Sequence, residues 1–220
     1  MTILMKHPDI STYKVLYKKY LEHLPENLVN RIKILPGMTI ADLCGGNGRL
    51  ALYVQGMGAT VSLVDMTKEM IPYELKTKGI TIYNCKVDTF LRAHNHNLYF
   101  DAVFCQQGIN FWFLDDPKIS EMLASIIKQN GYFVFNTFYK KPSKSVRIKD
   151  YILEGKQYYE ISYLINDNIV MHTQIIEGIT PHVTEFYWIS EEQFTERLKR
   201  YFEIEITQED NTAIYICRKK

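Results

Sequence analysis

The stretch that decides the fold of this chain is Thr39-Ile40-Ala41-Asp42-Leu43-Cys44-Gly45-Gly46-Asn47-Gly48-Arg49-Leu50. It begins as a short apolar run typical of a buried strand, passes through a glycine-rich turn, and ends in residues that favour a helix. Glycines at a strand-to-helix turn allow a ligand to lie against the backbone, at the positive end of the helix. The stretch therefore predicts a strand, a ligand-binding turn and a helix, in that order.

A second predicted strand, residues 60–64, ends in Asp65. An acidic side chain about 20 residues after a glycine-rich turn is well placed to accept hydrogen bonds from the two hydroxyls of a ribose. Together, the turn and Asp65 indicate a cofactor that contains adenosine.

The carboxylate of Asp42 distinguishes between two such cofactors. The sequence from Gly46 to Ala51 formally fits the dinucleotide fingerprint, which would indicate an NAD(P)-dependent oxidoreductase. However, a carboxylate directly before the glycines would repel a pyrophosphate, whereas it would attract the ammonium and sulfonium groups of S-adenosylmethionine. We therefore expect S-adenosylmethionine as the cofactor and keep the oxidoreductase as the disfavoured alternative.

The segment Asp42-Leu43-Cys44-Gly45-Gly46-Asn47-Gly48 resembles the first motif of the class I S-adenosylmethionine-dependent methyltransferases, in which an acid precedes a spaced run of glycines. The family often has Gly where this chain has Cys44. The cofactor residues expected in this first part of the site are Asp42, Cys44, Gly46, Gly48, Asp65 and Met66.

The resemblance extends to two further strand ends. The third predicted strand leads into Asp88 and Thr89, where an acid of the family meets the adenine amino group; a helix N-cap is the structural alternative for Asp88. After the fourth predicted strand, residues 100–105, the resemblance implies that the backbone at Cys105 and Gln106 faces the methionine part of the cofactor.

Four residues after the fourth strand are candidates for binding the substrate. Gln107 and Asn110 could donate hydrogen bonds to cofactor or substrate, and Phe111 and Trp112 could form an apolar wall near the transferred methyl group. The alternative for the two aromatic residues is packing in the core, which is the commoner role of aromatic side chains that follow a strand.

The N-terminal region predicts a helix over residues 11–24 with one apolar and aromatic face. Packing against the sheet is one interpretation of that face. The resemblance suggests another, in which this helix forms a lid over the cofactor and Tyr17 points toward it.

Strands and helices alternate five times between residues 39 and 138, and Thr137 ends the fifth strand. This alternation predicts an α/β protein with a Rossmann-like, doubly wound sheet and a ligand at the carboxyl ends of its strands. Among the helices we expect residues 68–76, capped by Thr67, and residues 116–129, capped by Asp116.

The remainder of the chain changes character. Residues 158–165, 169–176 and 182–188 alternate in hydropathy and predict a small antiparallel insertion after the fifth strand. Ser190-Glu191-Glu192-Gln193 is a capping box that begins a helix. Two more strands end the chain, and by resemblance the last lies antiparallel beside the fifth in a seven-stranded, mostly parallel sheet.

We expect one methyltransferase domain over residues 1–220. Its parts are an N-terminal helical lid, a cofactor-binding core, a β insertion that covers the substrate, and a final helix with two strands, at residues 1–36, 37–140, 151–189 and 190–220.

Two histidines of the insertion are candidate catalytic bases. His172 and His182 have a pKa suited to removing a proton from an amine or hydroxyl nucleophile. Tyr187, close to His182 in sequence, is a candidate for substrate binding. Alternation places His182 on one face of its strand and Tyr187 on the other. A surface or structural role is the alternative for each histidine.

Composition limits the classes of partner. The 220 residues carry a formal net charge of +1 and are 46% hydrophobic, so nothing indicates nucleic acid as a partner. One basic run, residues 140–144, is reinforced by Arg147 and Lys149. We interpret it as a solvated loop, and binding of phosphate or nucleic acid is the alternative. The four cysteines are widely spaced and predict neither a metal site nor a disulfide framework. No metal is expected, although His94 and His96 flank one polar loop.

The sequence has no signal peptide and no apolar segment long enough to cross a membrane, so we expect a cytoplasmic protein that does not bind membranes. By resemblance to sugar and amino-acid N-methyltransferases, the insertion is a candidate homodimer interface. The predicted function is methyl transfer from S-adenosylmethionine to an oxygen or nitrogen of a small molecule. A non-catalytic module that binds S-adenosylmethionine or S-adenosylhomocysteine is the main alternative.

Overall fold

The computed structural model describes residues 25–94, 97–138, 145–153, 155–178, 181–209 and 212–220. They fall into two compact units. The larger unit comprises Leu24–Tyr139 and Ser190–Lys220, and the described part of the smaller unit lies within Lys140–Ile189. The predicted N-terminal lid, including Tyr17, lies outside the described residues.

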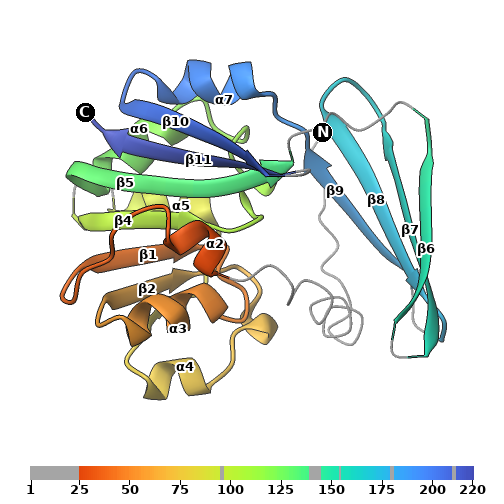
Figure 1. Cartoon of the computed structure of the whole chain (residues 1–220), viewed down its shortest axis with the longest axis horizontal. Helices are drawn as coiled ribbons and strands as arrows, with labels where there is room; N and C mark the ends of the chain where they lie inside the picture. The colour runs from red at the N-terminus through yellow and green to blue at the C-terminus, as the bar shows by residue number, and fades with distance from the viewer. Residues whose placement is uncertain (1–24, 95–96, 139–144, 154, 179–180, 210–211) are drawn as a thin grey trace. The chain divides into compact units, whose positions relative to one another are not determined.

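The larger unit contains a seven-stranded sheet in the order β10-β11-β5-β4-β1-β2-β3 (Figure 1). Its strands are β1 Thr39–Leu43, β2 Thr60–Val64, β3 Thr81–Tyr83, β4 Phe100–Cys105, β5 Ile127–Phe138, β10 Phe202–Glu209 and β11 Thr212–Lys219. Strands β5, β4, β1, β2 and β3, which are neighbours in this order, are parallel, and β11 is antiparallel to both β5 and β10. The predicted Rossmann-like sheet with an antiparallel last strand is therefore confirmed.

Helices cover both faces of this sheet (Figure 1). They are α2 Glu26–Val29, α3 Arg49–Gly56, α4 Glu74–Thr77, α5 Val87–His94, α6 Ile119–Ser125 and α7 Glu191–Leu198, with short 3-10 turns η2 Lys68–Met70 and η3 Ile109–Phe111. In Figure 1, α2 and α3 lie in front of the sheet and α5 and α6 lie behind it. The central strands are mostly apolar because both of their faces are covered.

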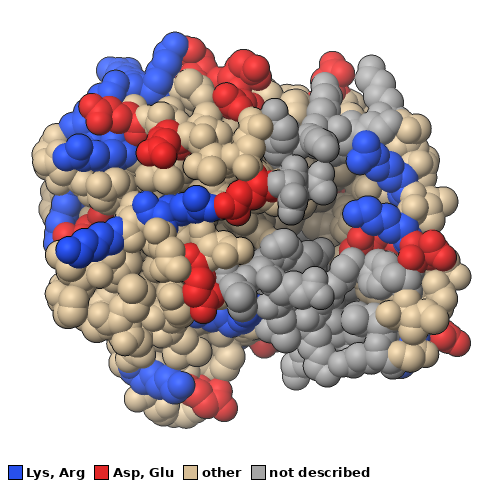
Figure 2. Space-filling model, viewed as in Figure 1, with Lys and Arg blue, Asp and Glu red and all other residues tan. Residues whose placement is uncertain are grey.

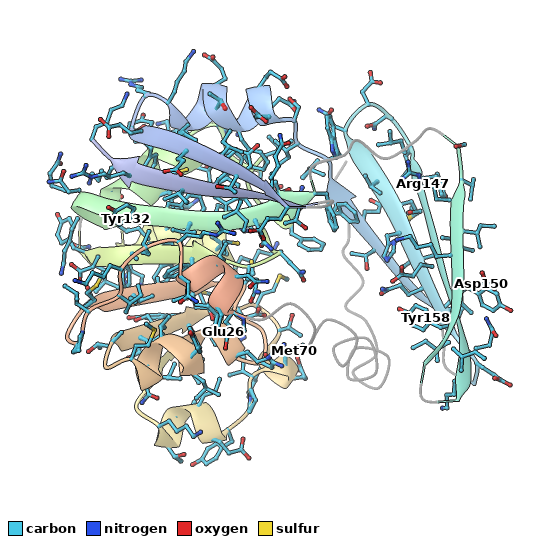
Figure 3. All side chains as sticks on the ribbon, viewed as in Figure 1. Glu26, Met70, Tyr132, Arg147, Asp150 and Tyr158 are labelled. Carbon is cyan, nitrogen blue, oxygen red and sulfur yellow. The ribbon has the colours of Figure 1, made fainter. Side chains whose placement is uncertain are left out.

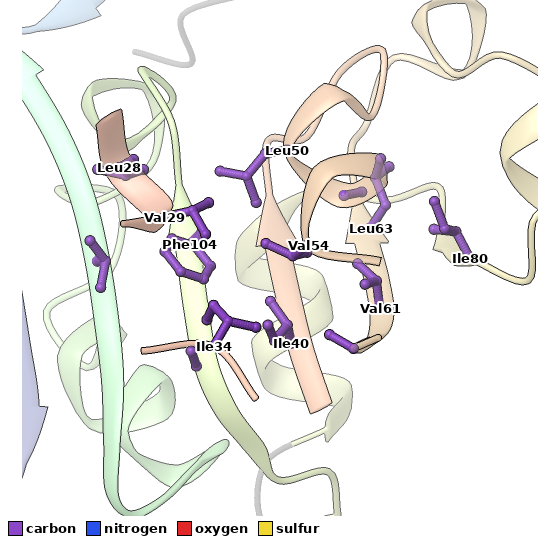
Figure 4. Close-up of a cluster of buried hydrophobic side chains, with 14 of the residues drawn as sticks. Leu28, Val29, Ile34, Ile40, Leu50, Val54, Val61, Leu63, Ile80 and Phe104 are labelled. Carbon is purple, nitrogen blue, oxygen red and sulfur yellow. The ribbon is translucent and has the colours of Figure 1, made fainter. Parts of the chain in front are cut away.

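A core of buried aliphatic side chains joins the front helices to the sheet (Figure 4). Leu28 and Val29 of α2 and Leu50 and Val54 of α3 are at most 2% exposed. They pack in one cluster with residues such as Phe104 of β4, which holds the start of α3 firmly against β1 and β2. The turn between β1 and α3 is thus fixed at both of its ends.

Two helices are shorter than predicted. The predicted helix 68–76 is interrupted, because Ile71 is extended (φ −86°, ψ 108°), as a residue before Pro72 prefers to be. Thr67 makes no side-chain cap there. The predicted helix 116–129 ends at Ser125, because β5 already begins at Ile127, which pairs with Phe100. Tertiary pairing with β4 overrides the local helix preference at this point.

The smaller unit contains a four-stranded antiparallel sheet in the order β6-β7-β8-β9. Its strands are β6 Arg147–Leu153, β7 Lys156–Leu164, β8 Ile169–Ile176 and β9 His182–Tyr187. The antiparallel insertion is therefore confirmed, but it has one strand more than predicted. Arg147 and Asp150 lie on β6, whereas Tyr158 lies on β7 (Figure 3). Arg147 and Lys149, which the sequence analysis assigns to a solvated loop, therefore belong to an edge strand.

Acidic and basic side chains alternate over the visible surface of the larger unit (Figure 2). This interspersed pattern accords with the formal net charge of +1. In the described ranges, no helix has the length and apolar character needed to cross a membrane.

Candidate functional site

The turn between β1 and α3 is built by glycines that have no room for a side chain. Gly48 has a positive φ of 76°, and a Cβ there would lie 2.4 Å from Leu75 Cδ1. A Cβ on Gly45 would lie 2.8 Å from both Leu63 Cγ and Asp42 Oδ2. The loop therefore lies close against β2 and α4 and leaves its backbone available to a ligand.

Asp42 lies beneath this loop. It is 1% exposed, and its Oδ2 accepts a hydrogen bond of 3.1 Å from the backbone N–H of Ala51 in α3. Burial raises the pKa of Asp42 from 3.8 to about 7; the Ala51 hydrogen bond opposes the rise and the charge of Asp65 adds to it. The carboxyl group therefore ties the loop to α3 and is in part protonated at neutral pH.

Asp65 lies directly beside the loop. Its Oδ2 accepts from the backbone N–H of Gly46 at 2.9 Å and its Oδ1 from that of Thr67 at 2.8 Å. The side chain is half-buried, as is Met66. Asn84, which the sequence analysis does not identify, supports Asp65: its Nδ2 donates to the backbone carbonyl of Asp65 at 2.9 Å.

Asp88 and Thr89 lie in the first turn of α5, so Asp88 is not an N-cap. Asp88 is half-buried, whereas Thr89 is exposed. Burial, followed by the nearby charge of Asp88, raises the pKa of Asp115. Asp88 and Asp115 are therefore close enough to interact electrostatically.

The turn after β4 is strained and is held in place by β5. Cys105 is fully buried, and Gln106 and Gln107 are half-buried. Gln107 has a positive φ of 60°, which is costly for a residue with a side chain. Its backbone N–H donates to Asn136 Oδ1 at 2.7 Å. Asn136 was not among the predicted site residues, although a polar side chain near the end of an otherwise apolar strand was a signal for it.

The predicted substrate residues of this turn have different environments. Asn110 is 2% exposed, and its Oδ1 accepts from Thr137 Oγ1 at 2.8 Å. Trp112 is 5% exposed and packs edge-on against Phe113, so the structure places its ring in the core. Phe111 is half-buried.

The candidate residues of the insertion do not all share one face. His172 is half-buried, lies opposite Ser162 and Thr184, and its ring centroid is 6.4 Å from that of Phe186. Tyr187 is paired with Ile169 and therefore projects from the opposite face, as the alternation predicts. His172 and Tyr187 are therefore not brought together. His182 pairs with Gln174 through the backbone; its side chain is outside the described part of the structure.

The larger unit brings most of the predicted cofactor residues to one edge of its sheet. Leu43 pairs with Val64, and Asp42 pairs with Phe104, so the residues that follow β1, β2 and β4 leave the sheet side by side. The close-packed glycine loop and the Asp65 carboxylate fit the adenosine and ribose of S-adenosylmethionine. In the part of the chain that is described, no cluster of three or more His, Cys, Asp or Glu residues is placed to hold a metal ion.

Comparisons with known proteins agree with this arrangement. Residues 41–135 match the family model of a methyltransferase domain, whereas no curated protein matches the chain. A solved S-adenosylmethionine-dependent methyltransferase from Clostridium acetobutylicum is 17% identical over 93% of this chain and 99% of that one, with a TM-score of 0.69.

Two other solved structures are also similar to the chain. One is an S-adenosylmethionine-bound amino pentose methyltransferase from Micromonospora echinaspora, 14% identical over 84% of both chains, with a TM-score of 0.65. The other is a sugar N-methyltransferase from a Streptoalloteichus species, 13% identical over 94% of this chain and 92% of that one, with a TM-score of 0.67. Residues 41–135 thus match a methyltransferase domain, and the chain has the fold of solved S-adenosylmethionine-dependent methyltransferases.

Proposed function

We propose that this protein is an S-adenosylmethionine-dependent methyltransferase that transfers the methyl group to an oxygen or nitrogen of a small molecule. The observation that carries this proposal is the antiparallel insertion between β5 and α7, which adds a four-stranded sheet to the cofactor-binding unit. Solved structures that match nearly the whole chain include an amino pentose methyltransferase and a sugar N-methyltransferase.

The insertion offers polar groups suited to such an acceptor. On one face, Gln174 Nε2 donates to Glu160 Oε1 at 3.5 Å, and both side chains are at most 9% exposed. His172 lies on the same face, two residues from Gln174 along β8. We assign the binding of the acceptor to this face, and Tyr187, which projects from the other face, becomes the weakest of the predicted substrate residues.

We assign cofactor binding to the loop and turn residues of the larger unit. Asp65 would accept hydrogen bonds from the ribose, and the turn at Gln106 and Gln107 would face the methionine part. The bound cofactor supplies an electrophilic methyl group. The protein must then hold the acceptor atom in line with that group and exclude water. His172, with His182 as the second candidate, would remove the proton from the nucleophile.

The proposal is tested in two steps with the purified full chain. Calorimetry first measures the binding of S-adenosylmethionine, S-adenosylhomocysteine and NAD to the wild type and to Asp65→Ala, with the exposed Asp167→Asn as a matched control. Release of S-adenosylhomocysteine is then followed with panels of amino sugars, hydroxylated aromatics, peptides and RNA.

Turnover with a small molecule, lost in Asp65→Ala and kept in Asp167→Asn, is the expected result. Turnover on peptides or RNA alone would contradict the small-molecule assignment. Tight cofactor binding without turnover on any acceptor would favour the non-catalytic module.

We also infer that the insertion forms a homodimer through its other face. Strand register places Ile148, Ile152, Tyr159 and Val183 on that face, and each is between 40% and 72% exposed. Contiguous apolar side chains in contact with water favour association. Light scattering should give the mass of a dimer for the wild type and of a monomer for Ile148→Lys with Ile152→Lys; a wild-type monomer would refute this.

A further inference from the structure

Cys44 and Cys105 lie next to each other where β1 and β4 end. Cys44 follows β1 directly, and Cys105 is the last residue of β4, the parallel neighbour of β1. Both sulfurs point toward Gly108. A Cβ on that glycine would lie 2.8 Å from Cys44 Sγ and 3.3 Å from Cys105 Sγ. The two thiols are therefore immediate neighbours at the cofactor edge of the sheet.

The contact between the two thiols also affects the pKa of Cys44. A hydrogen bond between Cys44 and Cys105, followed by burial and by the charges of Asp65 and Asp42, raises the pKa of Cys44. The Cys44 thiol also lies 3.9 Å from the carbonyl oxygen of Gly108. Cys44 is half-buried and Cys105 is fully buried, so a dissolved oxidant reaches Cys44 first.

The backbone of Cys44 connects the cysteine pair directly to the glycine loop. Cys44 has a positive φ of 57°, a conformation that glycine adopts without strain and that costs other residues about 1–3 kcal/mol. The next residues are Gly45 and Gly46, and Gly46 donates to Asp65. Any covalent restraint on Cys44 therefore acts directly on the loop that is assigned to the cofactor.

We propose that Cys44 and Cys105 form a reversible disulfide that lowers the affinity for the cofactor, so that oxidation switches the enzyme off. The regulatory part of this proposal rests on the placement of the cofactor at the glycine loop, whereas formation of the disulfide does not. The co-reactant is a peroxide, and a small dithiol reverses the reaction.

The reaction is balanced as follows for hydrogen peroxide. The Cys44 thiolate attacks one oxygen, the O–O bond breaks, and Cys44 becomes a sulfenic acid while hydroxide leaves and takes up the thiol proton as water. The Cys105 sulfur then attacks the Cys44 sulfur, the S–S bond forms, and the sulfenic oxygen leaves as a second water with the Cys105 proton. Two thiols and one peroxide thus give one disulfide and two waters.

The raised pKa of Cys44 sets the conditions of the reaction. Only the thiolate reacts, so the fraction of reactive Cys44 increases with pH. Asp42, Asp65 and Cys105 are the groups that face Cys44 and disfavour its ionisation. We therefore expect crosslinking to be slow at pH 7 and faster at pH 9.

The test uses the full-length protein and hydrogen peroxide. Intact-mass spectrometry detects the loss of two hydrogens, peptide mapping locates the bond, and calorimetry measures the affinity for S-adenosylhomocysteine before oxidation, after oxidation and after treatment with dithiothreitol. We expect a Cys44–Cys105 crosslink, a loss of affinity of about 10-fold or more, equivalent to about 1.4 kcal/mol, and recovery on reduction.

Two variants make the result specific. Cys217→Ala removes a buried cysteine of β11 and should keep the full response to peroxide. Cys105→Ser lacks the second thiol and should form no crosslink at Cys44, whatever its starting affinity. A protein that binds S-adenosylhomocysteine but forms no crosslink, or one whose crosslink leaves the affinity unchanged, would overturn the proposal. If the reduced protein does not bind S-adenosylhomocysteine, the cofactor placement is wrong and the regulatory part of the proposal is overturned. Mass spectrometry distinguishes this outcome from a missing crosslink.

Discussion

Two carboxylates near the end of neighbouring strands have different environments. Asp42 is buried and tied to the N–H of Ala51, whereas Asp65 is half-buried and accepts from the loop N–H of Gly46. Asp42 thus supports the loop from within the core, whereas Asp65 lies beside the loop, where we assign the ribose. Burial disfavours the charged form of Asp42 and raises its pKa.

Asp42→Asn should stabilise the protein without cofactor at neutral and alkaline pH. Because burial raises the pKa of Asp42 from 3.8 to about 7, the folded protein holds this proton more tightly than the unfolded chain. The stability from the protonated group is present below pH 3.8 and is lost as the pH rises toward 7. The advantage of Asn should therefore grow over this interval and reach about 4 kcal/mol, measured by urea unfolding.

Asp101→Asn is the matched control, and its effect on stability at neutral pH should have the opposite sign. Burial raises the pKa of Asp101, but hydrogen bonds from Lys128 and Thr39 outweigh it and hold that pKa below its usual value. Its stabilisation is present above the usual pKa and is lost as the pH falls, so this variant should be less stable at neutral pH. Parallel pH profiles for wild type and Asp42→Asn would contradict the role of burial.

Asn136→Ala should weaken cofactor binding through the strained turn. The variant leaves the N–H of Gln107 without its acceptor, a loss of about 1–3 kcal/mol when a backbone group is left unpaired. We expect lower stability together with a loss of affinity for S-adenosylhomocysteine of about 10-fold. Asn166→Ala, which removes the acceptor of two N–H groups in the β7–β8 turn, should cost stability but leave the affinity unchanged. An affinity unchanged in Asn136→Ala would refute the positioning role.

At the level of elements, α7 shows how a local signal determines a helix start. Ser190 Oγ accepts from the N–H of Gln193 at 3.2 Å, and Gln193 Oε1 accepts from the N–H of Ser190 at 3.0 Å. This capping box was predicted from four consecutive residues, and it forms because both partners lie within one turn of the chain.

Ser190→Ala should therefore destabilise the protein by about 1 kcal/mol, whereas Ser190→Thr, which keeps the capping oxygen, should be nearly neutral. A lowering of Tm by about 2–4 °C in scanning calorimetry corresponds to this loss for a chain of this size. Equal effects of the two substitutions would show that the hydroxyl group is not what stabilises α7.

Elements whose ends depend on distant partners were predicted less well. The helix expected to reach Gln129 stops at Ser125, because Ile127 joins the sheet beside Phe100. The strand Arg147–Leu153 was missed, because its edge position leaves Arg147 and Lys149 exposed to water. Charged residues are common on edge strands for that reason, and local composition then resembles that of a loop.

At the scale of the whole molecule, cofactor binding and acceptor chemistry are assigned to different units. His172→Ala should therefore reduce the rate of methyl transfer by about 100-fold or more, as expected for a lost general base, while the affinity for S-adenosylhomocysteine stays within about 2-fold. A variant that loses cofactor affinity in parallel with rate would contradict the division of roles.

The sequence by itself determined the parallel core, the glycine loop, the placement of Asp65 beside it, and the α7 cap. These features follow from periodicity and from contacts that are local or repeated along the chain. The tertiary structure alone decided that Asn136 holds Gln107, that Cys44 meets Cys105, and that Trp112 packs in the core. These contacts join residues of different strands and turns, and the pairing of the sheet, rather than any short pattern, brings them together.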